Sequence, residues 1–447
     1  MVGEIGTDNG VDCIGGSMKK AMVWIGVALG VALGSVGCSD RKATLGNDIP
    51  ITSENFPDEV FRKYLADEFD LDKSGTLEES ELQEVRKVGL KDSDLSSLKG
   101  VELLTNLETL TIENGHIEEL DVSACKSLRK LECDVGHLRQ LTVNGCETLE
   151  ELSCFWNGLM SLDVSQCSRL KRLYCNGNQL QSLNVKGCFR LEELNCGSNN
   201  LTSLDVSGCD ALRWLECYSN FLKELDKSGC VLLEYLDCSG NELSTLTVKY
   251  NTKLKHLDCA RNDLTSLDVS ANTALQYLIC WTNEITELDL RRTTELVYLD
   301  VSSNPISVLD VSWNPELLDL ICYHASLQDL DLRQNTKLSR LECYDNRLSK
   351  LDVSQNTVLA TLYCSQNQLQ ELDVSHNPSL TSLDCYENEL SQLDVGNCLW
   401  LYGVTVDPDV LFVGAEENDV SVNRYEKTWE ESNDSPYIRE TFPYIIY

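Results

Sequence analysis

Apolar residues recur along most of the chain in a pattern that repeats every 21 residues. Each repeat carries the frame Leu-x-Cys-x-x-Asn-x-Leu, for example from Leu173 to Leu180. The alternation of Leu and Cys with other residues predicts a short β-strand in every repeat, with the Leu and Cys side chains facing the interior. The cysteine of this frame recurs at Cys133, Cys154, Cys175, Cys196, Cys217, Cys238, Cys259, Cys280, Cys322, Cys343, Cys364 and Cys385, and Val301 occupies the one vacant step.

A fixed repeat of this length predicts a solenoid, in which each unit packs only on its neighbours. The frame matches the leucine-rich-repeat signature, with Cys in place of the last Leu of the strand. We therefore expect residues 101–406 to form a leucine-rich-repeat solenoid, a parallel β-sheet horseshoe of 21-residue repeats with little helix. Extending the period in both directions predicts fifteen strands, from Leu110-Thr111-Ile112 to Val404-Thr405-Val406. The second half of each repeat is too short for a regular helix and is expected to form an extended or turn-rich wall.

Two further series of residues follow the same period. Stacked repeats place equivalent cysteines side by side with parallel side-chain directions, which a disulfide does not accept, so we expect buried free thiols. The asparagines are expected to hydrogen-bond to backbone groups in the turns between strands. Soft-metal binding is the alternative for the cysteines, although no repeat offers the clustered Cys and His of a tetrahedral site. One series is Cys125, Cys146, Cys167, Cys188, Cys209, Cys230, Asn251, Asn272, Thr293, Asn314, Asn335, Asn356, Asn377 and Cys398; the other is Asn157, Asn178, Asn199, Asn220, Asn241, Asn262, Asn283, Asn304, Ala325, Asn346, Asn367 and Asn388.

The segment before the repeats contains a loop typical of calcium sites. In residues 70–81, oxygen-bearing residues stand at the ligand positions of an EF-hand loop, and Gly75 stands where such a loop turns sharply. The alternative is an acidic turn that matches by coincidence. The loop predicts a calcium ion bound by Asp70, Asp72, Ser74, the backbone carbonyl of Thr76, Glu78 through water, and Glu81.

Periodic apolar residues on both sides of this loop predict two helices, each with one buried face. Residues 51–100 are therefore expected to form a small α-helical, EF-hand-like cap on the first repeat. The first helix is expected to open at Pro57 and to bury Val60, Phe61, Tyr64, Leu65 and Phe69, and the second to bury Leu82, Val85 and Val88.

The first 38 residues have the features of an export signal. Met18-Lys19-Lys20 supplies positive charge, and the apolar stretch from Ala21 to Gly37 is shorter than the ~20 apolar residues that a membrane span needs. The small residues before Cys38 resemble a bacterial lipobox, so we expect residues 1–38 to be a signal segment with a lipidated Cys38; an ordinary signal peptide is the alternative. The protein is then exported and lipid-anchored at the bacterial outer membrane or cell surface, with a linker over residues 39–50. Translation begins at Met1 or at Met18.

Charge and motif content exclude several classes of function. The net charge of −35 disfavours nucleic acid, and contact with a membrane is expected only through the lipid anchor. The five histidines are scattered along the repeats, and the sequence has no HExxH motif, P-loop or nucleophile elbow. We therefore predict that the protein is not an enzyme.

Three positions of each repeat are expected to face outward from the sheet: the residue before the strand Leu, the residue between Leu and Cys, and the residue after Cys. They hold most of the aromatic residues of the repeats, interleaved with acids that disfavour acidic partners. Since Tyr and Trp dominate interface hot spots, we predict that this face binds an extracellular or host-surface protein, with a glycan as the alternative ligand. The β-propensity of aromatic residues would explain the pattern without any function. The predicted partner-binding residues are Phe155, Tyr174, Trp214, Tyr218, Tyr235, Tyr277, Trp281, Tyr298, Tyr323, Tyr344, Tyr363 and Tyr386, and the interleaved acids are Glu132, Glu216, Asp237, Asp258, Asp300, Asp319, Glu342 and Asp384.

The repeat LxxLxCxxNxLxxLDVSxN, over about residues 107–406, resembles the cysteine-ladder leucine-rich repeats of internalin J-like bacterial surface proteins. This resemblance implies a concave face that binds host or other extracellular proteins in adhesion. The segment from Phe56 to Phe61 and the loop after it also resemble the N-terminal region of bacterial secreted repeat proteins. Residues 442–447 lack the LPxTG wall-sorting signal of that family, which favours Cys38 as the anchor. Residues 407–447 are expected to form a C-terminal cap.

Overall fold

The computed structural model describes residues 48–91, 94–113, 115–414 and 421–424. The predicted signal segment with Cys38, most of the linker over residues 39–50, and the greater part of the predicted C-terminal cap lie outside the described residues. Within the described residues, none of the helices has the length and apolar character needed to cross a membrane.

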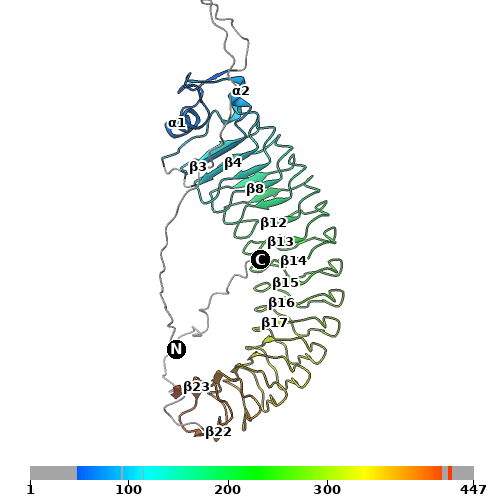
Figure 1. Ribbon diagram of the computed structural model, residues 1–447. Helices are drawn as coiled ribbons and strands as arrows, with labels where there is room; N and C mark the ends of the chain where they lie inside the picture. Colours follow the sequence, from blue (N-terminus) through cyan, green and yellow to red (C-terminus); the bar gives the residue numbers. More distant parts are fainter. Residues whose placement is uncertain (1–47, 92–93, 114, 415–420, 425–447) are drawn as a thin grey trace, which may run out of the picture. The chain divides into compact units, whose positions relative to one another are not determined.

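A long parallel sheet organises the described residues, and its strands follow one another along the inner side of the curve formed by the repeats (Figure 1). Neighbouring strands pair in register one repeat apart, as Leu236 pairs with Leu257. The strands of this main sheet are β3 (Lys87–Lys91), β4 (Thr109–Glu113), β6 (Lys130–Glu132), β8 (Glu151–Ser153), β10 (Arg172–Tyr174), β12 (Glu193–Asn195), β13 (Trp214–Glu216), β14 (Tyr235–Asp237), β15 (His256–Asp258), β16 (Tyr277–Ile279), β17 (Tyr298–Asp300), β18 (Asp319–Ile321), β19 (Arg340–Glu342), β20 (Thr361–Tyr363), β21 (Ser382–Asp384), β23 (Gly403–Val406) and β25 (Ser421–Arg424).

The predicted solenoid is confirmed, and the sheet is longer than predicted by one strand at each end. The fifteen predicted strands are those strands of the main sheet that run from β4 to β23. Strand β3 pairs with β4, and β25 pairs with β23. The period of 21 residues does not locate either strand, because Val88 and its partner Leu110 are 22 residues apart and the repeat signature ends before Ser421.

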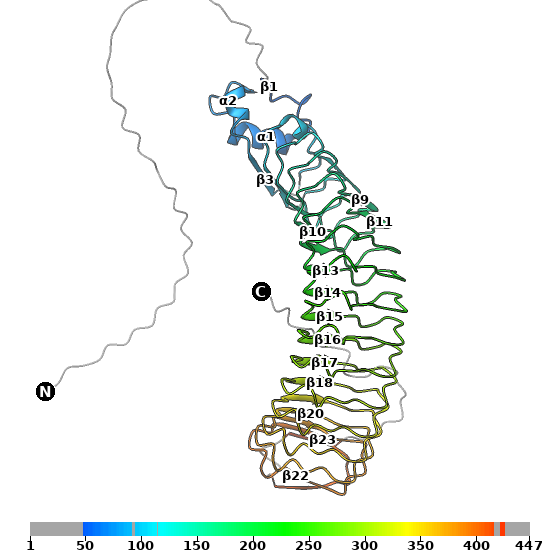
Figure 2. The same cartoon turned by 90° about the vertical axis from the view of Figure 1, so that its right-hand side faces the viewer.

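The second half of each repeat forms the predicted turn-rich wall, on the side of the solenoid opposite to the main sheet (Figure 2). Short parallel pairs occur in this wall near the ends of the array. They are β5 (Glu119–Asp121) with β7 (Gln140–Thr142), β9 (Ser161–Asp163) with β11 (Ser182–Asn184), and β22 (Gln392–Asp394) with β24 (Leu411–Val413).

Helix is confined, within the described residues, to the start of the array. Helix α1 (Glu59–Glu68) is followed by the four-residue helix α2 (Glu79–Leu82) and by the 3-10 helix η1 (Val101–Leu103), while β1 (Ile49–Pro50) pairs antiparallel with β2 (Thr76–Leu77). Asp58 caps α1 by accepting a hydrogen bond from the backbone N–H of Phe61, at 3.0 Å. Its other carboxylate oxygen accepts from the backbone N–H and the hydroxyl of Ser96, both at 2.9 Å, and so holds α1 against the first repeat.

The prediction of a second helix that buries Val85 and Val88 is wrong beyond Leu82, where α2 ends. Val88 lies in β3, in which Val88 and Leu90 are buried while Lys87, Gly89 and Lys91 are exposed. This alternation is the period of a strand, and the hydrogen bonds to β4 outweigh the weaker helical spacing of the same apolar residues. The main sheet thus begins at Lys87, inside the segment predicted to be the cap.

The second asparagine series links each repeat to its neighbour. Asn262 donates from Nδ2 to the backbone carbonyls of Cys238 and Cys259, at 3.0 and 3.1 Å, and its Oδ1 accepts from the backbone N–H of Leu243 at 3.0 Å. The prediction that these asparagines satisfy backbone groups in the turns is confirmed. Ala325 interrupts the series, and the backbone N–H of Ile306 donates instead to the Asn304 carbonyl, at 2.8 Å.

The prediction of buried free thiols is also confirmed for the described residues, in which every cysteine is free and buried. In the first series Cys146 donates from Sγ to the carbonyl of Val122 at 3.1 Å, and Asn272 donates from Nδ2 to the equivalent carbonyl of Val248 at 3.1 Å. Cys and Asn therefore interchange because both donate to the same backbone group of the preceding repeat.

The asparagine series provides a matched pair of substitutions. Asn262→Ala should lower the free energy of unfolding by about 2–4 kcal/mol, because it leaves the buried N–H of Leu243 unpaired and removes the bonds that Asn262 donates to the carbonyls of Cys238 and Cys259. Ala325→Asn should raise it by about 1 kcal/mol by restoring the missing bonds. Urea denaturation of the two variants and the wild type measures both effects. A destabilising effect of Ala325→Asn equal to that of Asn262→Ala would contradict this account.

Candidate functional site

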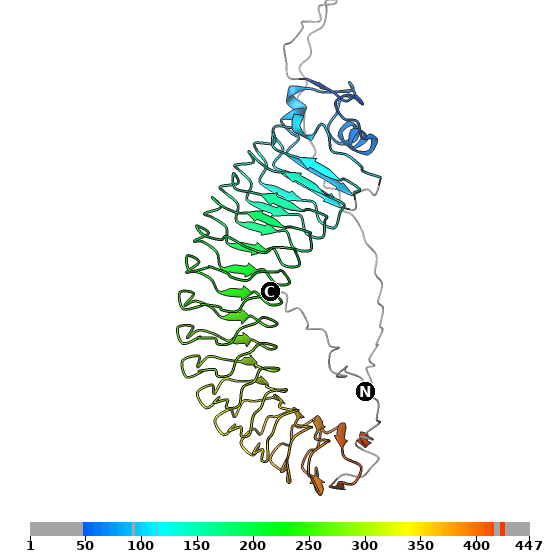
Figure 3. The same cartoon turned by 180° about the vertical axis from the view of Figure 1, so that it is seen from behind.

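The strand alternation separates core positions from outward positions. Leu236 in β14 and Cys238 directly after the strand are fully buried, whereas Tyr235 before Leu236 and Asp237 after it are half-buried. In other repeats some outward positions are buried as well, among them Asp300 and Ser302. We use the term sheet face for the three outward positions of each repeat on the main sheet, which lies on the inner side of the curve in Figure 3. All twelve predicted aromatic residues lie at these positions. Trp214 is the most exposed, at 41%, and Tyr344 is buried, at 8%.

The residues before the strand Leu form an aromatic column across five adjacent strands. The column consists of Trp214, Tyr235, His256, Tyr277 and Tyr298, and its successive ring centroids are 3.6, 4.3, 5.6 and 6.3 Å apart. His256 was not predicted to belong to it, although its position 21 residues from both Tyr235 and Tyr277 identifies it. Burial lowers the pKa of His256 to about 4, so the column contains a neutral imidazole near pH 7.

Several of the other predicted aromatic residues have contacts of their own. Tyr323 stacks on Tyr344 with 4.4 Å between centroids. Trp281 lies under the guanidinium of Arg261, 5.7 Å from the ring centroid. Tyr174 donates its hydroxyl to Glu193 in the N-terminal part of the face. The predicted site therefore contains a stacked aromatic column at its centre and further aromatic residues at other outward positions.

A row of acids lies beside the aromatic column, between the strand Leu and Cys. It consists of Glu216, Asp237, Asp258 and Asp300, with Ile279 in the place of an acid on β16. Burial raises the pKa of each of these acids; for Asp300 it rises to about 6, and for Asp258 the neighbouring Asp237 raises it further. Within this row, Asp300 has only 6% of its surface exposed. These carboxylates are therefore poorly solvated.

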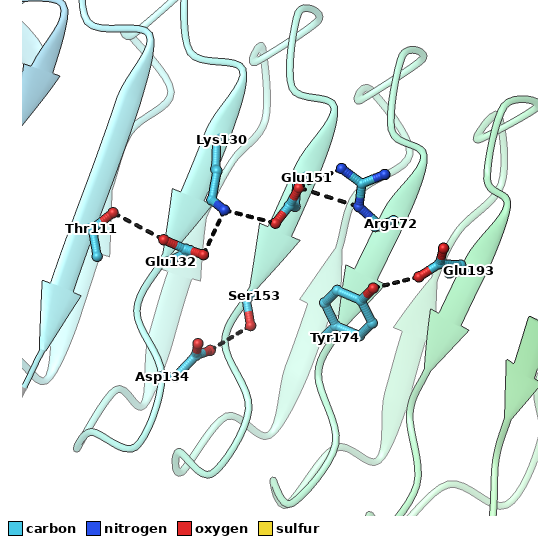
Figure 4. Close-up of polar contacts among 9 residues, drawn as sticks. All are labelled: Thr111, Lys130, Glu132, Asp134, Glu151, Ser153, Arg172, Tyr174 and Glu193. Atoms are coloured by element: carbon cyan, nitrogen blue, oxygen red, sulfur yellow. Dashed lines mark hydrogen bonds and ion pairs between the residues drawn. The ribbon is translucent and has the colours of Figure 1, made fainter. Parts of the chain in front are cut away.

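The N-terminal part of the sheet face has a different chemistry, because basic side chains neutralise its acids (Figure 4). Lys130 bridges Glu132 and Glu151, at 2.7 and 3.0 Å, and Arg172 pairs with Glu151 at 2.6 Å. On the other side of the centre, Arg340 pairs with Glu342 at 2.5 Å. Ion pairs therefore border the acidic centre on both sides.

The predicted calcium loop brings three of its carboxylates together. Oxygen atoms of Asp70, Asp72 and Glu81 lie within 4.8 Å of one another. Asp70 accepts from the backbone N–H groups of Ser74 and Gly75, both at 2.9 Å, which folds the loop around its own acids. A cluster of carboxylate oxygens fits a hard cation such as calcium.

The remaining predicted ligands lie near this cluster. The Ser74 hydroxyl donates to the Thr76 carbonyl at 3.0 Å, so these two oxygens are adjacent. Glu78 is exposed, and the charge of Asp72 raises its pKa. The donor set of this loop therefore consists of oxygen atoms alone, as a calcium site requires.

The comparisons with known proteins give matches to other leucine-rich-repeat proteins. The model of the leucine-rich-repeat domain of the endo-β-N-acetylglucosaminidase EndoS matches residues 56–195. The search of curated proteins gives no match. Among solved structures, the functional domain of InlJ from Listeria monocytogenes, which includes a cysteine ladder, is 33% identical; the match covers 80% of this chain and 81% of that one, with a TM-score of 0.74.

This chain belongs to the internalin J-like leucine-rich-repeat proteins with a cysteine ladder. Two further structures share the fold. The internalin InlF from Listeria monocytogenes is 21% identical over 84% of this chain and 99% of that one, with a TM-score of 0.56. A leucine-rich-repeat protein of Leptospira interrogans is 23% identical over 70% and 92%, with a TM-score of 0.55.

In this internalin J-like chain, Asp300 should make the folded state less stable as the pH rises from about 4 to about 6. The folded protein holds the Asp300 proton up to a pH of about 6, whereas the unfolded chain, with a pKa of 3.8, loses it earlier. Unfolding therefore releases a proton in this window and becomes more favourable as the pH rises. The corresponding free-energy change is about 3 kcal/mol.

Asp300→Asn should remove this dependence. Relative to the wild type, the variant should gain about 3 kcal/mol in free energy of unfolding between pH 4 and pH 7, measured by urea denaturation. The control is Asp268→Asn on the opposite wall, because hydrogen bonds from the Ser270 side chain and backbone lower the pKa of Asp268. The account is wrong if both variants change equally with pH.

Proposed function

We propose that this internalin J-like chain is an exported bacterial surface lipoprotein whose sheet face binds an extracellular or host-surface protein in recognition or adhesion. The export signal and the lipidation of Cys38 rest on the sequence of residues 1–38 alone. The sheet face is proposed as the binding surface because of one observation, the aromatic column on β13–β17.

The aromatic column suits a protein partner for physical reasons. Tyr and Trp offer large, rigid and amphipathic contact surfaces at low cost in conformational entropy, and stacking restricts their rotamers further. Tyr277 and Tyr298 are half-buried, so a partner completes their burial rather than ordering mobile side chains. The chain reserves this face for recognition, while buried Leu, Cys and Asn stabilise the repeats.

A triple substitution tests this proposal. Tyr277, Trp281 and Tyr298 changed together to Ala should reduce affinity at least tenfold for a protein captured by the wild type from host or bacterial surface extracts. The measurement is biolayer interferometry with the purified partner. Intact affinity would show that the partner binds elsewhere.

The matched control removes three exposed aromatic side chains from other parts of the repeats. Phe189, Tyr250 and Trp313 are 65%, 50% and 52% exposed and lie outside the strands of the main sheet. Their joint change to Ala should leave the affinity unaltered. Loss of binding in this control would indicate that general surface hydrophobicity explains the capture.

A glycan ligand is the second candidate. The family model that matches residues 56–195 carries the name of an enzyme of glycans, an endo-β-N-acetylglucosaminidase, and aromatic rings also stack on sugars. Binding of the full chain to a glycan array, without capture of any protein, would favour this candidate over a protein partner.

We propose further that residues 70–81 bind calcium in an EF-hand-like manner and thereby stabilise the N-terminal segment. For a dissociation constant on the order of 10⁻⁴–10⁻³ M, 10 mM calcium should stabilise the wild type by about 1–3 kcal/mol. Asp70→Asn should abolish this increment, measured by thermal unfolding with calcium and with chelator. Asp67→Asn, an exposed position on α1, should retain it. Equal stability of the wild type with calcium and with chelator would refute the site.

A further inference from the structure

The charge of the sheet face changes abruptly at its centre. On β13–β17, the three outward positions of each strand include no Lys or Arg. The nearest basic residues of the face are already engaged, since Arg172 pairs with Glu151 and Arg340 pairs with Glu342. The centre therefore combines aromatic rings with carboxylates that have no basic partner on the same strands.

In two of the central acids, the hydrogen bonds within the chain use only one of the two carboxylate oxygens. Asp258 accepts from the backbone N–H of Ala260 at 3.0 Å, and Asp300 from the N–H and the hydroxyl of Ser302 at 3.0 and 2.5 Å. All of these bonds end on Oδ1. The second oxygen of each carboxylate, Oδ2, is thus the one that can accept a hydrogen bond from a ligand.

These two features together suit a planar cation. A guanidinium group is planar, lies over Tyr and Trp rings more often than an ammonium does, and presents several N–H donors in that plane, so it can contact a ring while donating to the open oxygen of a carboxylate. The chain itself already places one guanidinium over an aromatic ring of the sheet face, because Arg261 lies 5.7 Å from the ring centroid of Trp281. Neutral glycans would leave the acids without a counter-charge.

We propose that the centre of the sheet face binds a polypeptide segment through arginine side chains that enter between the aromatic column and the acids Asp258 and Asp300. The proposal rests on the proposed function and names the chemistry of the partner. The occupant is an arginine-bearing segment in the polyproline II conformation.

The spacing of the two acids fits such a segment. Asp258 and Asp300 are two strands apart, with Ile279 between them. Strands are ~4.8 Å apart, so two steps amount to ~10 Å. Residues three apart in a polyproline II segment, which has three residues per turn, point to the same side and are ~9 Å apart, at ~3.1 Å per residue. Two arginines three positions apart therefore match the two acids.

The test uses the purified full chain and a hexapeptide, acetyl-Gly-Arg-Ser-Gly-Arg-Gly-amide. Isothermal titration calorimetry should give an affinity at least tenfold higher than for the same peptide with citrulline in place of both arginines, because citrulline keeps the planar shape and loses the charge. Equal affinities for the two peptides overturn the proposal. This comparison requires no variant, so it holds even if a substitution impairs folding.

Two double variants then locate the site. Asp258→Asn with Asp300→Asn should remove the preference for arginine over citrulline. The control is Asp268→Asn with Asp310→Asn, which changes the net charge by the same amount. These two aspartates lie in the Leu-Asp-Val elements, half a repeat after Asp258 and Asp300, and accept hydrogen bonds from Ser270 and Ser312. This double variant should retain the preference for arginine. Loss of the preference in both double variants would show a general charge effect and would overturn the proposal.

The outcome also separates this inference from the proposed function. If the acid variant binds the captured protein as tightly as the wild type, while the aromatic triple variant does not, the sheet face binds a protein but arginine recognition at Asp258 and Asp300 is wrong. If neither variant affects capture but the peptide shows the arginine preference, the proposed binding surface for that protein is wrong and the arginine site stands.

Discussion

The structure depends on the hydrogen bonds that join each repeat to the next at one fixed pitch. The asparagine series exemplifies them, since one side chain bonds to its own turn and to the turn of the preceding repeat. Because the repeats from β4 to β23 have 21 residues each, equivalent side chains stack in columns along this part of the array. Leu and Cys columns fill the interior, and Cys and Asn interchange where only a donor to a backbone carbonyl is needed.

The same stacking determines the properties of the sheet face. Burial of the acids in this row removes their hydration and raises their pKa values, and the neighbouring Asp237 and Asp300 raise the pKa of Asp258 further. Such a row costs stability, which is consistent with a surface kept for binding rather than for folding. On either side of the centre, Lys130, Arg172 and Arg340 form ion pairs with Glu132, Glu151 and Glu342.

The sequence predicts the solenoid, its fifteen central strands and the roles of its ladders, because a repeated residue at a repeated distance has only one way to stack. The sequence predicts the two ends of the main sheet less well. Val88 fits both a helical spacing and a strand alternation, and the pairing with β4 favours the strand. A search for Phe, Tyr and Trp misses His256, although its place in the period puts it in the aromatic column. The ion pairs of Lys130, Arg172 and Arg340 beside the acidic centre depend on side-chain positions, which the repeat pattern does not contain.

The central claim is that in-register stacking makes the sheet face the binding surface. Hydroxyl-radical footprinting of the chain, free and with its captured partner, tests this most directly, because Trp and Tyr react rapidly and are present on both sides of the repeats. The account predicts that Trp214, Tyr277 and Trp281 lose reactivity in the complex while Trp313 and Tyr250 keep theirs. Protection of Trp313 and Tyr250, with unchanged labelling of the aromatic column, would contradict it.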